Sequence, residues 1–382
     1  MRRGDSYAPV FARGARIPPR EVTRPPDASD EDDEYGPSVG PYSSRSRLAH
    51  TPARGRPPAP PQLLCAPVPT LLDKRLIFVT GKGGVGKSTV ATALGLLAAR
   101  RGLRTVVAEL SSQERVQRLF GHKGEHFQEV ELAPGLFTIS IDPEHAMDEY
   151  LRVKIGPLGQ ALGSSRLFQA FAMATPGMRE LLSIGKVWEL AQLHRRTRGG
   201  GAYDLVIVDS PATGHGVGLL RTPRTFAEIA RVGPIAHQGR TIAATIADRD
   251  FTGVVAVATP EEMPVNETLS LRDSLEQEQL ALDLVVLNAL YPVRFDEQEV
   301  LELEGALSRS RSRLSRSALR AALSEHARAR TQREQRARLS EGVDGRLIEL
   351  PFVFADHVGP DELEVLVRVL EDRLAMPAKG PR

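Results

Sequence analysis

The clearest chemical signature is a glycine-rich stretch, Gly81-Lys82-Gly83-Gly84-Val85-Gly86-Lys87-Ser88, which is followed by Thr89. It fits the pattern G-x-x-x-x-G-K-[ST], whose backbone N–H groups surround nucleotide phosphates. The glycines permit this turn because no Cβ atom obstructs it. Lys87 would neutralise the β- and γ-phosphates, and the Ser88 hydroxyl would bind Mg²⁺. The stretch therefore predicts ATP and Mg²⁺ as cofactors.

A second group of candidate residues follows a later apolar run, Leu205–Val208, which ends in Asp209. An aspartate at the tip of a parallel strand beside the phosphate loop would hold Mg²⁺ through water. Gly214 can turn its amide toward a γ-phosphate, as a nucleotide switch requires. We interpret the neighbouring His215 as a positioning residue. The residue types alone thus give Lys87 and Asp209 as catalytic candidates, and Ser88 and Asp209 as metal ligands.

Seven short apolar runs predict the strands that position these residues. Helical stretches separate the runs, which is typical of a parallel sheet covered on both faces. The glycine-rich stretch comes directly after the first run and before a helix, as the motif requires. The predicted fold class is α/β, a doubly wound, mostly parallel sheet of the P-loop NTPase type with an inserted helical subdomain. The runs are Arg75–Thr80, Thr105–Ala108, Leu136–Ile141, Leu205–Val208, Val254–Ala258, Leu284–Leu287 and Leu347–Leu350.

Composition divides the chain of 382 residues into a tail and one large domain. The first 70 residues hold 14 of the 28 prolines and ten arginines, with few large aliphatic residues, which predicts a disordered tail over 1–72. We interpret it as a solvated extension, with a docking or regulatory arm as the alternative. The P-loop ATPase domain is expected over 73–376, with helical insertions at about 144–200 and 298–342. Residues 377–382 are expected to be a flexible C-terminus.

The cysteine count and the charge balance exclude several classes of protein. A single cysteine, Cys65, excludes a disulfide framework, a zinc site built from cysteine pairs and an iron–sulfur cluster. The net charge of +2 excludes a globally polybasic protein. Between Ala306 and Ser340 there are ten arginines and two glutamates, which we interpret as a solvated helix face. Nucleic-acid binding is not expected there, because no aromatic residues interleave with the arginines.

The hydropathy of the chain predicts neither a membrane span nor a secretory signal. No run approaches 18 consecutive apolar residues. The N-terminal stretch, Met1 to Asp27, has no apolar segment of the kind that a secretory signal requires. The expected location is therefore the cytoplasm.

Lys82 narrows the class of phosphate loop. The form K-G-G-x-G-K-[ST] resembles the deviant Walker A class, which includes the MinD, ParA, nitrogenase iron protein and ArsA families. This resemblance implies that Lys82 reaches the partner's nucleotide across the interface of a homodimer and has a catalytic role. The segment from Asp209 to His215 resembles the D-T-A-P-T-G-H segment of the ArsA/GET ATPases. These are the ATPases of arsenite pumps and those that target tail-anchored membrane proteins.

Further segments resemble the ArsA/GET family over about residues 74–376. Pro176–Glu180 and Ile141–Glu144, the latter followed by Tyr150, look like the family's client-binding helix and the junction before it. Asn288 resembles a strand-end asparagine that recognises adenine, and Pro351–Phe354, which contains Phe352, resembles the loop on the adenine side. The nucleotide-binding candidates are Gly81, Lys82, Gly83, Gly84, Val85, Gly86, Lys87, Ser88, Thr89, Gly214, Asn288 and Phe352.

The resemblance implies a Mg²⁺-dependent ATPase whose nucleotide state gates a partner, either a hydrophobic membrane-protein segment or a membrane transporter. The insertion at 144–200 offers candidate apolar contacts for such a client, although apolar residues at helical spacing equally fit a core. One helix can also bury one stripe and offer another. These residues are Met147, Leu151, Leu162, Leu167, Phe168, Phe171, Met173, Met178, Leu181, Leu182, Ile184, Val187, Trp188 and Leu190.

Three departures from the family pattern affect the expected function. Ser111 stands where the family has an aspartate that orients the attacking water, so hydrolysis is expected to be slow. Glu109 is the candidate substitute, Glu114 is a second, and local hydrogen bonding is the alternative role for Glu109. The family's Cys-x-x-Cys pair is absent. With Cys65 as the only thiol, direct activation by a trivalent arsenic species is not expected.

Two other functions remain open at this stage. One is a MinD/ParA-like positioning ATPase that binds a membrane or a nucleoid. The predicted last helix, Asp361 to Leu374, is acidic rather than basic and amphipathic, which disfavours membrane attachment of the MinD kind. The other is a nucleotide-binding scaffold with little turnover, which Ser111 suggests.

Overall fold

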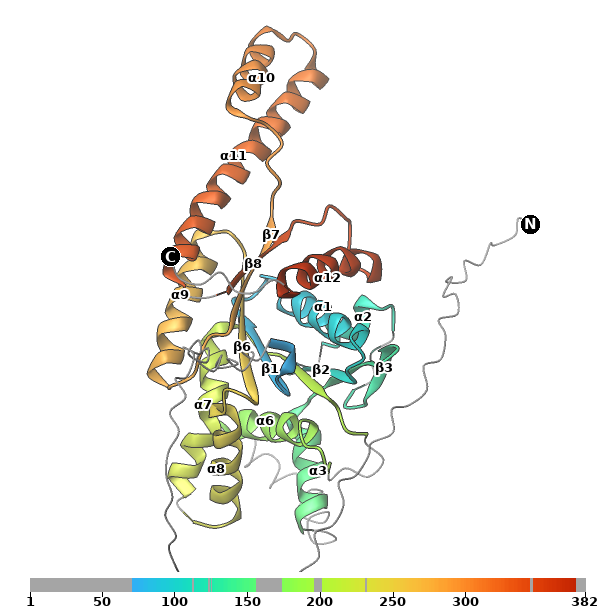
Figure 1. The fold of residues 1–382 in the computed structure, drawn as a ribbon, viewed down its shortest axis with the longest axis vertical. Helices are drawn as coiled ribbons and strands as arrows, with labels where there is room; N and C mark the ends of the chain where they lie inside the picture. Colours follow the sequence, from blue (N-terminus) through green and yellow to red (C-terminus); the bar gives the residue numbers. More distant parts are fainter. Residues whose placement is uncertain are drawn as a thin grey trace, which may run out of the picture. The chain divides into compact units, whose positions relative to one another are not determined.

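The computed structural model describes residues 71–375 except 112, 123, 125, 156–173, 196–200, 231 and 344–345. Within this part of the chain, eight strands form one sheet in the order β3-β4-β2-β5-β1-β6-β7-β8 (Figure 1). All neighbours pair parallel except β3 and β4. The predicted α/β fold with a mostly parallel sheet is confirmed. The strands are β1 (Leu76–Gly81), β2 (Thr105–Glu109), β3 (Val130–Ala133), β4 (Leu136–Ser140), β5 (Leu205–Asp209), β6 (Thr252–Ala258), β7 (Leu284–Leu290) and β8 (Arg346–Pro351).

The central strand β1 explains why the strands have apolar residues at every position of their sequence. Leu76 and Phe78 belong to the hydrophobic cluster on one face of the sheet, whereas Ile77 and Val79 belong to the cluster on the other face. Successive side chains of a strand point to opposite faces, so a strand covered on both sides needs apolar residues at every position. Strand order also reverses around β1, and such switch points place ligands at the carboxyl edge of the sheet.

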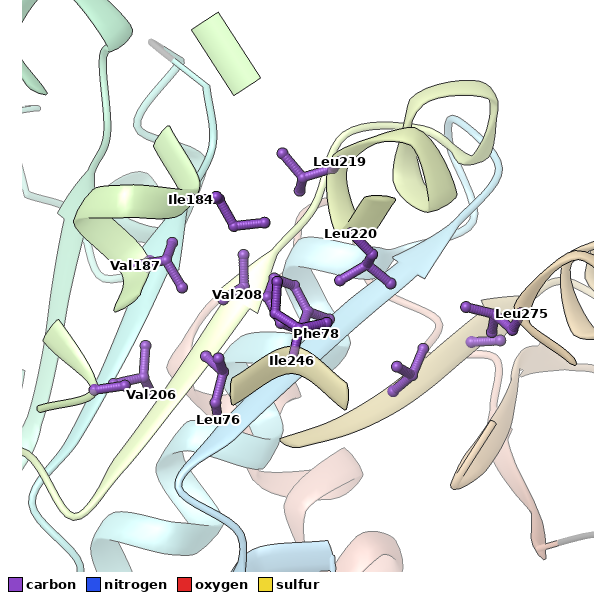
Figure 2. Packing of buried hydrophobic residues seen from close by; sticks show 14 of the residues in the cluster. Leu76, Phe78, Ile184, Val187, Val206, Val208, Leu219, Leu220, Ile246 and Leu275 are labelled. Atoms are coloured by element: carbon purple, nitrogen blue, oxygen red, sulfur yellow. The ribbon is translucent and has the colours of Figure 1, made fainter. Parts of the chain in front are cut away.

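Helices cover both faces of the sheet. On one face lie α1 (Lys87–Arg100), α2 (Arg115–Leu119) and α12 (Pro360–Ala375), which supply apolar residues to the same cluster as Ile77. On the other face lie α6 (Met178–Leu190), α7 (Thr213–Ala230), α8 (Pro234–Ala247) and α9 (Glu262–Gln277). Figure 2 shows Ile184 and Val187 of α6 packed toward Val206 and Val208 of β5. The sheet therefore holds its carboxyl edge rigidly between two helical layers.

Two parts of the fold occupy the predicted helical insertions. Helix α3 (Pro143–Ile155) precedes α6, and the stretch 156–173 between them lies outside the described residues. Helices α10 (Glu297–Arg309) and α11 (Arg313–Gly342) form a hairpin that extends away from the sheet (Figure 1). The lower end of α11 packs on α9 and β7, with Leu339 buried. We call α10 and α11 the arm.

The structure differs from the predicted elements at two places. A short 3-10 helix, η1 (Leu71–Asp73), precedes β1, and Leu71 and Leu72 are buried, so the packed chain begins before the predicted boundary at residue 73. Strand β3 was not predicted, because its four residues, Val-Glu-Leu-Ala, form a partly exposed edge strand with no apolar run. None of the helices in the described part of the chain combines the length and hydropathy that a membrane crossing requires.

Candidate functional site

The phosphate loop joins β1 to α1 at the carboxyl edge of the sheet, and two of its glycines are required by their surroundings. Gly81 has φ of 148°, and a Cβ there would lie 2.2 Å from the Val257 carbonyl oxygen. Gly86 has φ of 92°, and a Cβ there would lie 2.4 Å from the Asn288 side-chain nitrogen. An L side chain would be strained by its backbone and would clash at both positions. These contacts fix the loop between β6 and β7.

Lys87 points back across the loop. Its Nζ donates a hydrogen bond to the Lys82 carbonyl oxygen at 2.9 Å. Burial lowers the pKa of the Lys87 ammonium, and the charge of Asp209 opposes that effect. A phosphate oxygen is a stronger acceptor than a carbonyl because its hydrogen bond is charge-assisted. A phosphate oxygen would therefore compete well with this carbonyl for the ammonium, and phosphate binding by Lys87 stays a prediction.

The residues predicted to hold Mg²⁺ lie in direct contact. Ser88 Oγ donates to Asp209 Oδ2 at 2.5 Å. Asp209 is only 6% exposed, and its Oδ1 is buried with no hydrogen-bond partner among the described residues. Burial raises the pKa of Asp209 to about 6, although the Ser88 hydrogen bond lowers it. A buried carboxylate oxygen with no partner beside a hydroxyl suits a hard cation such as Mg²⁺.

The rest of a Mg²⁺ coordination shell would come from outside the protein. In the part of the chain that the structure describes, no group of three or more His, Cys, Asp or Glu side chains could hold a metal ion. Mg²⁺ commonly keeps several waters and binds substrate phosphates beside one or two protein ligands. The pair Ser88 and Asp209 thus fits Mg²⁺ that arrives with a nucleotide.

Both carboxylate oxygens of Glu109 accept hydrogen bonds from nearby residues of the chain. It lies opposite Asp209 in the β2–β5 ladder and is 1% exposed. Its Oε1 accepts from Ser111 Oγ at 2.8 Å and from the Arg115 N–H at 3.1 Å, and its Oε2 accepts from the Val116 N–H at 3.3 Å. These two N–H groups belong to the first two residues of α2, so Glu109 accepts hydrogen bonds from backbone donors that have no partner within the helix. The contacts favour the local role of Glu109 over the catalytic one, which stays a prediction.

The two residues predicted to contact adenine lie at the carboxyl ends of β7 and β8: Asn288 is two residues before the end of β7, and Phe352 directly follows β8. Asn288 Nδ2 donates to the Val85 carbonyl oxygen at 2.9 Å, so its amide contacts the phosphate loop. Phe352 stacks on Tyr291 with ring centroids 4.7 Å apart, and its N–H donates to the Leu290 carbonyl oxygen. Adenine binding by Asn288 and Phe352 stays a prediction. Neither contact was indicated by the sequence.

Lys82 forms an ion pair within its own chain. Its Nζ lies 2.9 Å from Glu267 Oε1 on α9, and both side chains are 33% exposed. Sequence reasoning missed Glu267, because nothing in its neighbourhood marks it and it lies far along the chain. Thr89 falls in the first turn of α1 and Gly214 in the first turn of α7. The His215 side chain lies outside the described residues.

An apolar groove lies between α3, α6 and α8, and charged residues at its wall are paired with one another. Lys186 Nζ contacts Glu149 Oε1 at 2.8 Å and Glu189 Oε2 at 3.2 Å. Their mutual pairing leaves a lining that is mostly apolar. The groove is lined by Ala146, Glu149, Tyr150, Val153, Met178, Leu181, Leu182, Gly185, Lys186, Trp188, Glu189, Gln238, Gly239 and Ile242.

The apolar residues predicted for this insertion divide between core and groove. Ile184, Val187 and Leu190 of α6 are buried against the sheet. The other side of α6 lines the groove with Met178, Leu181, Leu182 and Trp188. One helix therefore buries one stripe and offers another. Met147 and Leu151 are buried, whereas Leu162, Leu167, Phe168, Phe171 and Met173 lie outside the described residues.

Comparison with known proteins agrees with this geometry. The family model described as anion-transporting ATPase matches residues 74–232 and 228–312. The chain is 30% identical over 234 residues to ATPase BagA of Mycobacterium tuberculosis, a match that covers 59% of this chain and 68% of the relative. It is 24% identical over 247 residues to the arsenical pump-driving ATPase of Escherichia coli, covering 59% and 41% of the two chains.

A third relative is ATPase GET3 of Podospora anserina, which is 24% identical over 262 residues, covering 58% of this chain and 75% of the relative. The chain belongs to the anion-transporting ATPase family, and it is an ATPase. The predicted resemblance to the ArsA/GET ATPases is confirmed.

Proposed function

We propose that this ATPase depends on Mg²⁺, forms a homodimer around ATP in the cytoplasm, and uses its nucleotide state to control an apolar protein segment in the groove. The observation that carries the proposal is the contact between Ser88 and Asp209. Among the described residues, Asp209 Oδ1 is buried without a partner, which leaves a place for a cation to contact the carboxylate. Ser88 and Asp209 would hold Mg²⁺, which would neutralise charge on the transferred phosphate when bound.

Lys82 supports the proposed dimer. The resemblance to the deviant Walker A class assigns Lys82 to the partner's nucleotide, and the structure holds its Nζ 2.9 Å from Glu267 in the same chain. Because both side chains are a third exposed, this pair is weak. Lys82 can therefore leave Glu267 at small cost when a phosphate of the partner's nucleotide comes within reach.

The groove supports an apolar client. Lys186 pairs with Glu149 and Glu189, and apart from Gln238 and two glycines the remaining lining is aliphatic, aromatic or methionine. A helical protein segment buries its apolar face in such a groove through anchors spaced by three or four residues. A membrane-protein segment is the class of client that this lining fits best.

Slow turnover is the second part of the proposal. The Ser111 hydroxyl donates to Glu109, and Glu109 also accepts two backbone N–H groups. Neither group is positioned as a free base for water. We therefore expect ATP to be hydrolysed slowly, so that the ATP-bound dimer persists long enough to hold a client.

Hydrolysis and sedimentation measurements test the nucleotide part of the proposal. We expect turnover with Mg²⁺, none with EDTA, and a shift from monomer to dimer on adding ATP and Mg²⁺. Lys82→Ala should keep ATP binding but lose the ATP-driven dimer. Glu267→Ala is the matched control, because it releases the same ion pair but leaves Lys82 in place, and it should keep the dimer. Turnover in EDTA, or an ATP-driven dimer in Lys82→Ala, would refute this part.

Two glycine substitutions test the groove. Gly185 on α6 lines the groove, and a Cβ there would meet none of the described residues within 4 Å. Gly185→Phe should therefore fill the groove and weaken the binding of a leucine-rich peptide of about 20 residues. Gly218 on α7 has equally open surroundings outside the groove lining, so Gly218→Phe is the matched control. Equal peptide affinity in both variants would refute the groove as the client site.

A further inference from the structure

The far end of the arm carries uncompensated positive charge. Residues 305–324, which we call the arm tip, contain five arginines and no acidic residue. They span the end of α10, the turn and the first part of α11. The turn lies at the end of the hairpin that is farthest from the sheet (Figure 1). The five are Arg309, Arg311, Arg313, Arg316 and Arg320.

The lower half of α11 shows how arginines of a solvated helix face are usually accommodated. Arg328 donates to the Tyr291 hydroxyl at 3.1 Å, and its guanidinium lies over the Tyr291 ring. Arg330 pairs with Glu334 one turn away, and Arg336 lies 2.6 Å from Glu349. Three of the five arginines in this half, Arg328, Arg330 and Arg336, thus have a tyrosine or a glutamate as partner. The arm tip offers its arginines no acidic residue on its own segment.

None of the ion pairs formed by the described residues includes an arm-tip arginine. Helix α10 carries four glutamates nearer the base of the arm, at 297, 299, 302 and 304, and one of them, Glu299, caps the helix by bonding to the Asp296 N–H. All five arginines are exposed. The positive charge is therefore available to an external anion.

The arm tip also lacks a core of its own. Helix α10 has no buried residue, and the first buried residue of α11 is Ala329. Leu314, between Arg313 and Arg316, is 81% exposed. An exposed leucine flanked by arginines is the pattern of a helix that lies at a membrane interface, where the leucine enters the acyl boundary and the arginines meet the headgroups.

We propose that the arm tip binds the surface of an anionic phospholipid membrane. The arginines contact the lipid phosphates, and Leu314 enters the interface. Nucleic acid carries the same phosphate chemistry, but the arm tip has no aromatic side chain for base stacking and Leu314 has no role there. Each basic residue near an anionic surface strengthens binding about fivefold, or about 1 kcal/mol, so five arginines suffice for reversible attachment.

Co-sedimentation of the full chain with vesicles tests this proposal. One vesicle preparation is phosphatidylcholine alone, and the other is equal parts of phosphatidylcholine and phosphatidylglycerol. The tip variant is Arg311→Glu with Arg313→Glu, and Leu314→Ser removes the apolar anchor. The control is Arg333→Glu with Arg338→Glu, which makes the same charge change on the same helix about 30 Å lower, several Debye lengths away. The tail is identical in every variant.

We expect the parent chain to sediment with the anionic vesicles only. The tip variant should bind at least about 20-fold more weakly, Leu314→Ser about threefold more weakly, and the control within about twofold of the parent. ATP turnover and thermal unfolding should be the same in all of them, which excludes loss of folding. Failure of the parent to bind anionic vesicles, or equal loss in tip variant and control, would overturn the proposal. Tip-dependent binding to duplex DNA without binding to vesicles would overturn it in favour of nucleic acid.

Discussion

Two buried clusters of charge in this ATPase differ in whether their polar atoms already have partners. At the phosphate loop, Asp209 bonds to Ser88 through one oxygen, and its other oxygen has no partner among the described residues. The second cluster adjoins the groove through Glu189. Its Arg195 side chain is 1% exposed and lies 2.6 Å from Glu129 and 3.2 Å from Glu189. The Tyr203 hydroxyl donates to Glu129 at 2.6 Å.

The pKa values of the carboxyl groups shift in opposite directions in the two clusters. At the phosphate loop, burial raises the pKa of Asp209 to about 6. In the Arg195 cluster burial also acts to raise the pKa values of Glu129 and Glu189, but hydrogen bonds from Arg195 outweigh it and lower both. At the phosphate loop, a carboxylate oxygen still lacks a partner among the described residues, and a cation could supply it. In the Arg195 cluster, the two carboxylates are already paired with Arg195. We infer that the first serves ligand binding and the second serves stability.

The largest expected effect comes from Asp209→Asn, which removes the charge that would hold Mg²⁺. Turnover should fall on the order of 1,000-fold, as expected for loss of a preorganised charge contact in phosphoryl transfer. Single-turnover hydrolysis with Mg²⁺ measures this loss. A variant that keeps parental turnover would show that Asp209 does not hold the metal.

The same variant should be more stable than the parent without Mg²⁺ and nucleotide. The folded pKa of Asp209 is raised, so its stabilising contribution is present below about pH 4 and is lost as the pH rises through about 6. Asp209→Asn should therefore gain up to about 3 kcal/mol in free energy of unfolding at pH 8 and little near pH 4. Urea unfolding at the two pH values measures the gain. A loss of stability at pH 8 would show that the charged carboxylate of Asp209 has stabilising partners beyond the Ser88 hydroxyl.

Arg195→Met should change the free energy of unfolding in the opposite direction to Asp209→Asn. It leaves Glu129 without its ion-pair partner and Glu189 with Lys186 alone, so the free energy of unfolding at pH 7 should fall by about 3 kcal/mol. The folded pKa values of these carboxyls are lowered, so their contribution is present above about pH 4.5 and is lost as the pH falls further. The deficit of the variant should shrink below pH 4.5. Nucleotide affinity should stay within twofold of the parent, and a larger change would break the proposed division of roles.

Lys87→Ala should weaken ATP binding on the order of 100-fold, because the phosphates lose the nearest cation of the loop. Its effect on the free energy of unfolding should be below about 1 kcal/mol, since Nζ donates to a loop carbonyl and burial lowers the pKa of the ammonium. Calorimetric titration with ATP and urea unfolding give the two numbers. Unchanged ATP affinity would contradict the assignment of the loop.

The smallest expected effect is that of Glu109→Gln. With its oxygen in the place of Oε1, the amide still accepts from the Ser111 hydroxyl and the Arg115 N–H, but its NH₂ group then faces the Val116 N–H donor, which should cost about 1 kcal/mol of stability. Turnover should stay within threefold. A fall of tenfold or more would show that Glu109 orients the attacking water.

Ser111→Asp alone should not raise turnover, contrary to what the sequence suggests, because the new carboxylate would stand against Glu109. In the structure the Ser111 hydroxyl lies 2.8 Å from that residue. Two carboxylates at such a distance repel each other, and one of them holds a proton. The combination Ser111→Asp with Glu109→Gln should relieve the repulsion and turn over faster than Ser111→Asp alone. Equal rates in single-turnover hydrolysis would contradict this explanation.

Local patterns in the sequence predicted much of the fold. Seven apolar runs became parallel strands, because strands covered on both faces leave a continuous apolar signal. The phosphate loop and Asp209 were predicted because a motif and a strand end mark them. Strand β3 was missed because an edge strand with partly exposed residues leaves no such signal.

Contacts between distant segments were not predictable. Nothing near Lys82 indicates Glu267 on α9, and nothing near Asn288 indicates that its amide donates to Val85. The capping role of Glu109 depends on where α2 begins, which neither periodicity nor composition determines. Such partners follow from tertiary packing alone, and they decide which candidate residues are available for catalysis.

The central claim is that the nucleotide site and the groove are coupled, and Trp188 can report it directly. It is the only tryptophan of the chain, it lines the groove, and its indole N–H donates to Thr245 Oγ1. Its fluorescence should follow titration with an unlabelled leucine-rich peptide of about 20 residues. We predict that the peptide Kd differs at least about fivefold between saturating ATP and ADP, each with Mg²⁺, and that the peptide shifts ATP affinity by the same factor. Equal peptide Kd values in the two nucleotide states would contradict the account.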